Sequence, residues 1–154
     1  MKTIRYRVSA EMAQYAVTRR LHYARDQLFD LVADVESYPC FVPYLAAVRV
    51  DRRGDPEIRV DMLFVFGPLR RRIQSTGVLH RPSRIVITST DAPFRLFRFD
   101  WRFQSAPSGH TDVEFSAEFE FRSGPLRRWA RENPQAPEAR PQNPVNLNAI
   151  PPLF

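Results

Sequence analysis

Residues able to carry catalysis or hold a metal are few in this chain, and their spacing forms no recognisable site. The histidines His22, His80 and His110 are far apart, with no second ligand at metal-site spacing. Cys40 is the only cysteine, so no internal disulfide can form, and its neighbours predict a small buried hydrophobe. The sequence has no phosphate-binding glycine loop and no nucleophile elbow, and its acids fall mainly on outward faces of the expected strands. These residues predict no enzyme, no metal and no resident cofactor.

Arginine is the second chemical feature. Lys2 is the only lysine among 23 basic residues, and the formal net charge is +6. The densest run is Arg70, Arg71 and Arg72. Arginine binds phosphate bidentately, so one interpretation is an acidic partner such as RNA or an anionic lipid surface. The alternative is a G+C-rich genome, which favours arginine codons without any functional demand.

Aromatic residues are concentrated on the segments that alternate like strands. They are Phe64, Phe66, Phe94, Phe97, Phe99, Trp101, Phe103, Phe115, Phe119 and Phe121. Each one alone reads as core filling. A curved sheet crossed by one helix does not cover so wide an aromatic face, so a second helix, a ligand or a partner must lie against it.

Composition divides the chain near residue 126. With 154 residues and 44% hydrophobic content, the chain fits one globular domain, expected over residues 1–126. Half of the 14 prolines follow residue 124, so residues 127–154 are expected to form a short helix and a proline-rich tail. The sequence holds no 18-residue apolar run, and the stretch before Tyr15 is too polar for a signal peptide, so a cytoplasmic protein is expected.

Alternation of apolar and polar residues predicts an antiparallel sheet. It is strongest in 57–66, 97–103 and 112–121, and weaker strands are expected at 13–22, 45–52, 70–80 and 84–90. The outward arginines of 98–102 and the outward acids of 112–120 are expected to pair across neighbouring strands. The turn residues between these segments, such as Pro107-Ser108-Gly109, favour short connections.

One segment, 25–35, has helical spacing instead. The apolar residues form one stripe that would lie on the sheet: Leu28, Phe29, Leu31, Val32 and Val35. The following prolines are expected to end the helix in a short, stiff connection. The predicted order is one strand, one helix and six strands, an α+β fold.

Several spaced motifs agree with one known family. They are Leu-Phe-Asp-Leu-Val-Ala-Asp-Val-Glu-Ser-Tyr-Pro at 28–39, Phe-Val-Pro at 41–43, and the segments 92–96, 101–103, 113–115 and 119–123. Together they resemble the coenzyme-Q-binding START-like proteins of the polyketide cyclase/dehydrase and lipid transport group, of which one branch is named for a ribosome-association toxin. The resemblance covers residues 13–126.

This resemblance implies a helix-grip (START/SRPBCC-like) fold, in which a curved antiparallel sheet surrounds a long C-terminal helix and a hydrophobic tunnel. It also implies non-catalytic binding of ubiquinone or another isoprenoid quinone, in support of respiration or quinone biosynthesis. The ligand-binding residues implied by position are Tyr38, Phe41, Val42, Pro43, Phe94, Leu96, Trp101 and Phe103.

The chain departs from the family at its C-terminal end. Where the family has a long helix, residues 127–132 allow one or two turns before the prolines. The tail residues Leu147, Ile150, Leu153 and Phe154, or a second chain in a homodimer, would have to cover the groove.

Three functions remain open from sequence. The first is quinone or lipid binding, with peripheral contact to the inner membrane. The second is ribosome binding through the arginine-rich surface. The third is an aromatase/cyclase-like enzyme, which would need an acid/base pair on the inward faces, where the sequence offers none.

Overall fold

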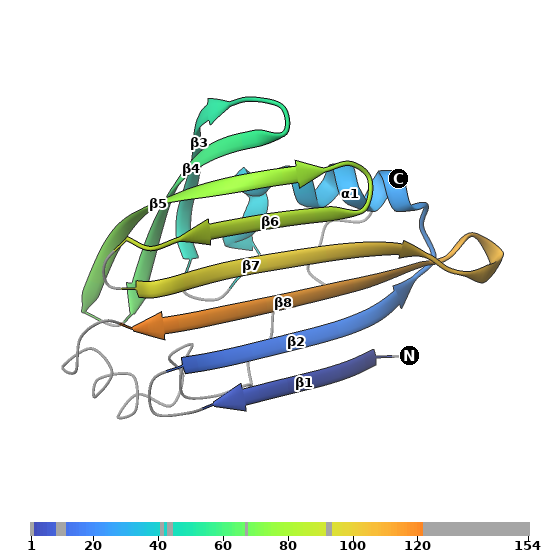
Figure 1. Ribbon diagram of the computed structural model, residues 1–154, viewed down its shortest axis with the longest axis horizontal. Helices are drawn as coiled ribbons and strands as arrows, with labels where there is room; N and C mark the ends of the chain where they lie inside the picture. Colours follow the sequence, from blue (N-terminus) through green and yellow to red (C-terminus); the bar gives the residue numbers. More distant parts are fainter. Residues whose placement is uncertain are drawn as a thin grey trace.

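An antiparallel sheet of eight strands, in the order β1-β2-β8-β7-β6-β5-β4-β3, forms the body of this computed structural model (Figure 1). The structure describes residues 2–8, 12–40, 42, 45–66, 68–91 and 94–121, and the counts given below refer to them. The strands are β1 (Lys2–Val8), β2 (Met12–Leu21), β3 (Leu45–Arg53), β4 (Glu57–Phe66), β5 (Leu69–His80), β6 (Arg84–Ser89), β7 (Phe94–Ser105) and β8 (Thr111–Phe121). The sheet is curved, and the helical segments lie on one of its faces (Figure 1).

The seven strands expected from alternation are confirmed, with ends within a few residues of the predicted ones. The expected order was incomplete, because β1 precedes the first predicted strand and pairs with β2, as Tyr6 with Tyr15. The missed signal was short: Ile4, Tyr6 and Val8 alternate with Arg5 and Arg7, which is the same period of two in a polar setting.

The helix of the predicted apolar stripe is α1 (Arg25–Ala33), two residues shorter than expected. Its first residue follows Ala24, whose side chain offers no cap, and Gln27 Oε1 accepts the Ala24 N–H at 3.2 Å instead. Within the expected short, stiff connection, residues Val35–Cys40 form a 3₁₀ helix, η1, with Pro39 inside it. Cys40 is exposed, so its expected burial is wrong.

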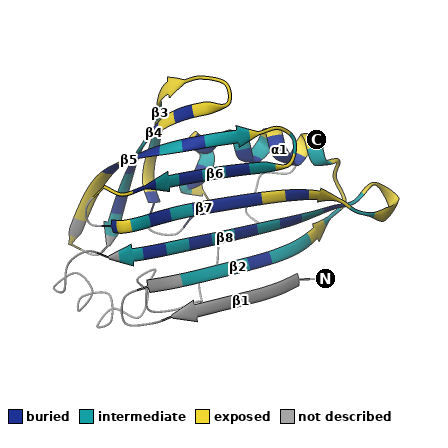
Figure 2. Cartoon of the chain, viewed as in Figure 1, coloured by how far each residue is buried: buried dark blue, intermediate teal, exposed yellow. Residues whose placement is uncertain are grey.

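The two faces of the sheet differ sharply in burial (Figure 2). We call the face that carries α1 the inner face; its side chains are almost all buried, as Ile85 and Ile87 on β6 illustrate. The opposite, outer face carries arginines, acids and threonines, most of which are exposed or half-buried. Figure 2 shows this alternation along β7 and β8.

The hairpin between β7 and β8 turns through the short 3₁₀ segment η2 (Pro107–Gly109), at the predicted turn. Ser108 and Gly109 there have φ of 62° and 74°, a left-handed conformation that glycine adopts without strain. The boundary expected at residue 126, the short final helix and the proline-rich tail all lie outside the described residues.

Candidate functional site: the aromatic inner face

Strands β7 and β8 place a continuous layer of aromatic rings on the inner face. Trp101 and Phe115 have ring centroids 4.4 Å apart, and Phe99 lies 5.3 Å from Phe115. Phe97 continues the layer at 4.5 Å from Phe99 and 5.6 Å from Phe119. Most of these rings are tilted or edge-on, arrangements that aromatic pairs prefer. The layer therefore follows directly from the period-two pattern of the two strands.

The helical segments cover the part of this layer near the β7–β8 hairpin. Phe29 of α1 packs edge-on against Phe103, with centroids 5.8 Å apart, and the Arg81 guanidinium lies over the Phe29 ring, 4.7 Å from its centroid. Tyr38 of η1 lies 6.2 Å from Trp101 and 6.5 Å from Phe99. This part of the inner face is a conventional core between helix and sheet.

Tyr38 is fully buried and its hydroxyl donates to the Val32 carbonyl oxygen at 2.8 Å. Burial raises the pKa of Tyr38 well above its ordinary value, while a hydrogen bond with Trp101 acts in the opposite direction. The hydroxyl therefore stays protonated and ties η1 to the end of α1.

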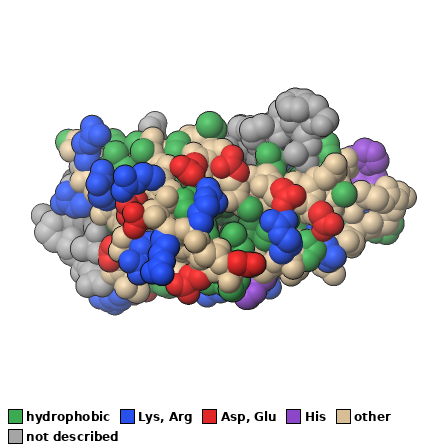
Figure 3. Space-filling model, turned by 90° about the horizontal axis from the view of Figure 1, so that it is seen from above, with side chains coloured by type: hydrophobic (Ala, Val, Ile, Leu, Met, Phe, Trp, Pro, Cys, Tyr) green, Lys and Arg blue, Asp and Glu red, His purple; other side chains and the backbone are tan. Residues whose placement is uncertain are grey.

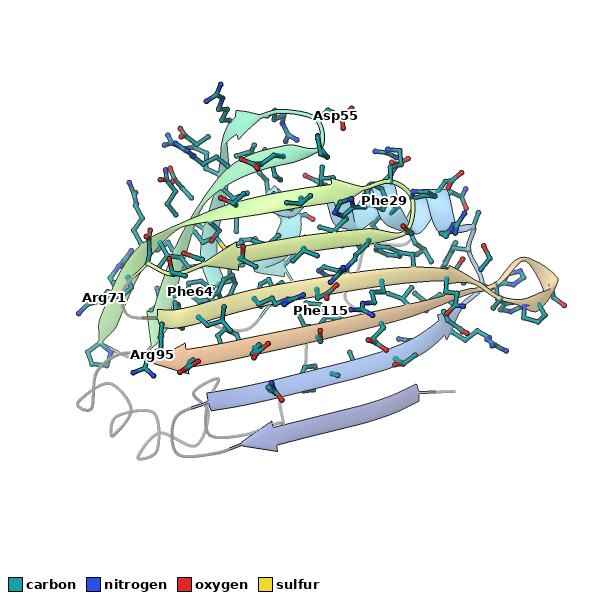
Figure 4. The ribbon with its side chains drawn as sticks, viewed as in Figure 1. Phe29, Asp55, Phe64, Arg71, Arg95 and Phe115 are labelled. Carbon is teal, nitrogen blue, oxygen red and sulfur yellow. The ribbon has the colours of Figure 1, made fainter. Side chains whose placement is uncertain are left out.

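The far end of the layer lies beyond α1, where the strands themselves supply the rings (Figure 4). Phe64 of β4 packs edge-on against Phe94 at 5.6 Å and Phe97 at 5.4 Å. Phe119 lies 5.9 Å from Phe94. The inner-face residues of β7 from Phe97 onward have odd numbers. A β-bulge between Phe94 and Leu96 shifts the register of β7 on β8, so that the even-numbered Phe94 also faces inward.

The structure brings together five of the eight implied ligand-binding residues. Tyr38, Val42, Phe94, Trp101 and Phe103 are buried in the core cluster. Leu96 is half-buried and stands opposite Glu120 on the outer side of the alternation, so it does not join Phe94. Phe41 and Pro43 lie outside the described residues.

One polar residue of the inner face was missed from the sequence. Tyr15 of β2 pairs with Ala117 and its ring lies 6.5 Å from that of Phe115. Its hydroxyl oxygen is sealed from solvent, and burial raises the pKa of Tyr15 to about 12. The signal was available, because Tyr15 and Val17 alternate with Gln14 and Thr18, but the weak strand drew no attention to it.

The outer face is organised around the carboxylate of Asp100. Arg84 donates to it through Nε at 3.0 Å and Nη2 at 2.8 Å, while Arg98 and Arg102 approach at 3.4 and 3.3 Å. The Asp100 side chain is only 6% exposed. Burial acts to raise the pKa of Asp100, but hydrogen bonds from Arg84 and Arg102 outweigh it and the pKa lies below its ordinary value.

The arginines of 98–102 stand opposite the acids of 112–120 as predicted, but they do not form ion pairs with them in the described structure. Arg98 stands opposite Glu118, and Arg102 stands opposite Glu114. Their ion pairs among the described residues are instead with Asp100, on their own strand. Figure 3 shows acidic and basic groups interspersed over the surface seen from above.

The arginine run lies at the start of β5. Arg70, Arg71 and Arg72 are all exposed, and none of them takes part in a salt bridge with another described residue. Figure 4 places Arg71 and Arg95 at the same end of the sheet. This end is therefore a surface of uncompensated positive charge, apart from the ion pair of Arg95 with Glu120.

Two of the three histidines meet although they are far apart in sequence. His22 Nδ1 lies 3.1 Å from His110 Nε2, and His110 Nδ1 contacts the Pro107 carbonyl oxygen at 3.2 Å. Within the described part of the chain, no group of three or more histidine, cysteine or acidic side chains is placed to hold a metal ion. The same residues include no helix long and apolar enough to cross a membrane.

Comparison with known proteins identifies the group to which these features belong. Residues 21–138 match the family described as "Polyketide cyclase / dehydrase and lipid transport". The 18 kDa protein CC1736 from Caulobacter crescentus, solved in solution, is 30% identical with a TM-score of 0.58, covering 78% of this chain and 84% of that one. The predicted α+β class of helix-grip, START-like type is confirmed.

Two curated relatives carry different functional names. The chain is 28% identical over 106 residues to "Ribosome association toxin RatA" of Pseudomonas aeruginosa, covering 69% of this chain and 73% of that protein. It is 29% identical over 118 residues to "Coenzyme Q-binding protein COQ10, mitochondrial" of Drosophila melanogaster. That match covers 71% of this chain but 47% of the Drosophila protein, so the chain spans about half of its length.

Proposed function

Because the chain belongs to the polyketide cyclase/dehydrase and lipid transport family, we propose that it binds an isoprenoid quinone, or a similar lipid, without transforming it. The observation that supports this proposal is the continuous, buried aromatic layer from Phe103 to Phe94, against which α1 and η1 place Phe29 and Tyr38. The relative named for coenzyme Q binding favours a quinone. The protein would support respiration or quinone biosynthesis from the cytoplasm, at or near the inner membrane.

The chemistry of the layer suits such a ligand. Burial of each methylene of a polyprenyl tail contributes about 0.8 kcal/mol, and ligand sites are commonly apolar with a few placed polar groups. Phe94 and Val42, with Phe41 and Pro43, would form the mouth of the site. Trp101, Phe103 and Tyr38 would line its deep end. Residues 1–126 would form the binding domain, with residues 127–154 or a second copy as its remaining cover.

The test is native mass spectrometry with lipid extraction, on protein purified from a quinone-producing host. The wild type is expected to carry about one quinone per chain, and the same spectrum reports whether the carrier is a monomer or a homodimer. Phe94→Ser should lose the quinone. Its matched control is Arg95→Ser, which changes the neighbouring residue on the opposite face and should keep it.

Both variants must retain the far-UV circular dichroism of the wild type. If Phe94→Ser does not fold, Phe94→Leu takes its place, since it keeps an apolar side chain of moderate volume. Wild-type protein that is empty after purification and after incubation with quinone vesicles would contradict the proposal.

The exposed run of Arg70, Arg71 and Arg72 favours a second candidate function, association with the ribosome. The supporting observations are their lack of ion pairs with described residues and the relative named as a ribosome association toxin. Arginine contacts to phosphate release counterions, so binding of this kind weakens steeply as salt rises.

Cosedimentation with purified ribosomal subunits tests this second function. Replacing the three arginines by glutamine should abolish binding and its salt dependence. The control replaces Arg20, Arg49 and Arg53, which already pair with acids, by glutamine. Equal binding by the two triple variants would contradict a specific role of Arg70, Arg71 and Arg72 in ribosome association.

A further inference from the structure

The polar side chains of the inner face are nearly all provided with hydrogen-bond partners. Ser75 Oγ lies 3.6 Å from Met62 Sδ, and Ser89 Oγ donates to the Gln74 carbonyl oxygen at 2.6 Å. The Tyr38 hydroxyl donates to Val32, as described above. Each of these groups has exchanged water for a protein partner, as buried polar groups normally do.

Tyr15 differs from these three residues. Its hydroxyl oxygen is inaccessible to solvent and has no hydrogen-bond partner among the described residues. A buried hydroxyl without a partner is unfavourable, because the hydrogen bonds that it made to water are not replaced. Because the buried Tyr15 hydroxyl lowers the stability of the free protein, we look for a bound molecule that could supply its hydrogen-bond partner.

The surroundings of Tyr15 define the chemistry of the missing partner. Tyr15 stands opposite Ala117 and beside Phe115, which continues through Trp101 into the aromatic layer. A tyrosine hydroxyl is neutral at physiological pH and available as a donor, and burial, which raises the pKa of Tyr15 to about 12, keeps it so at higher pH. An acceptor oxygen carried by an otherwise apolar molecule would complete the hydrogen bonding of this hydroxyl in these surroundings.

We propose that the Tyr15 hydroxyl donates a hydrogen bond to a carbonyl oxygen of the ligand bound on the inner face. This inference rests on the proposed function and narrows the ligand to apolar molecules with a carbonyl group, such as a quinone or an acyl ester. The aromatic layer supplies affinity for the hydrocarbon part, and Tyr15 fixes the position of the oxygen-bearing end.

The experiment compares wild type with Tyr15→Phe, which removes one oxygen atom and keeps the ring. Binding is measured by isothermal titration with decylubiquinone, with a fatty acid methyl ester and with a hydrocarbon of similar length that has no oxygen. The variant should bind at least one carbonyl ligand about 2- to 10-fold more weakly, the range expected for one net hydrogen bond. The hydrocarbon should bind equally well to both proteins. A loss confined to decylubiquinone identifies the quinone head as the partner, and a loss confined to the ester identifies the acyl group.

The free protein provides a second, independent readout. Tyr15→Phe should unfold at the same or a higher urea concentration than wild type, because it removes an unpaired polar atom. Tyr38→Phe serves as the stability control and should unfold at a lower urea concentration, because its hydroxyl is already hydrogen-bonded.

The outcomes separate this inference from the proposal on which it rests. Unchanged affinity of Tyr15→Phe for both carbonyl ligands, or an equal loss for the hydrocarbon, would overturn the role of Tyr15 while leaving lipid binding in place. Failure of the wild type to bind any of the three ligands would overturn the proposed function, and this inference with it.

Discussion

The same strands supply both faces of the sheet, but the inner face consists mainly of apolar side chains and the outer face mainly of charged and polar ones. On β7, Phe97, Phe99 and Trp101 are fully buried, while Arg98 and Arg102 between them hold 40% and 57% of their side-chain surface exposed. The inner face gains stability from apolar burial, which has no preferred direction. The outer face depends on one sheltered carboxylate that organises three arginines.

This difference determines which face can change function without loss of the fold. Rings of the inner layer contact several others, so a ligand that enters among them must replace contacts already made. Outer-face ion pairs in water contribute little each, so arginines there can be exchanged for partner contacts at low cost. The proposed lipid binding would therefore be coupled to stability on the inner face, while the proposed ribosome contacts would be nearly independent of stability.

The largest effect is expected at the centre of the inner layer. Phe99 contacts Phe97, Phe115 and Phe119 and is fully buried. Phe99→Ala should lower the free energy of unfolding by about 3–5 kcal/mol, through lost burial and the cavity left behind. Urea unfolding followed by circular dichroism measures it, and a loss below about 1 kcal/mol would show that the layer is not the core.

An intermediate effect is expected at Asp100. Asp100→Asn removes the charge shared by Arg84, Arg98 and Arg102 and leaves three neighbouring cations with weaker acceptors. We expect a loss of about 1–3 kcal/mol, the range for hydrogen bonds to charged groups. The same urea titration applies, with Asp51→Asn as control, since Asp51 only approaches Arg49 at 4.0 Å. Equal losses of unfolding free energy in the two variants would mean that Asp100 stabilises the fold no more than an exposed acid does.

The same carboxylate predicts how stability depends on pH. The folded pKa of Asp100 lies below its unfolded value, so its contribution is complete above pH 4 or so and is lost as pH falls through the folded pKa. The free energy of unfolding should therefore fall less between pH 6 and pH 3 in Asp100→Asn than in wild type. Parallel curves for the two proteins would contradict this assignment.

The smallest effect is expected for an exposed pair. Arg53 Nη2 donates to Glu36 Oε1 at 3.0 Å, joining β3 to η1, and both side chains are about half exposed. Glu36→Gln should change the free energy of unfolding by less than about 1 kcal/mol. A thermal melt at low and high salt checks this, and a larger change would indicate that η1 depends on the pair for its position.

Sequence patterns predicted the strands well because burial on one face imposes a strict period of two. Around Trp101 and Phe115, each residue of the two strands faces the side that the alternation predicts. The α1 stripe was found for the same reason, since one apolar face packs on the sheet. These elements depend on local periodicity, which is visible without knowledge of the partners.

The features that sequence missed depend on distant contacts. The bulge that turns Phe94 inward and leaves Leu96 outward is set by the pairing of β7 with β8. The meeting of His22 with His110 follows from the pairing of β2 with β8. The lack of a hydrogen-bond partner for the Tyr15 hydroxyl among the described residues emerges only when the contacts across several strands are known. None of these has a signature within a single segment.

The most direct test of the account asks whether a quinone reaches the aromatic layer itself. The chain has two tryptophans, so Trp129→Phe leaves Trp101 as the single fluorescent indole. Titration with decylubiquinone should quench Trp101 fluorescence to a plateau at about one quinone per chain. Quenching that never saturates, and matches that of a free indole at the same quinone concentration, would contradict ligand binding on the inner face.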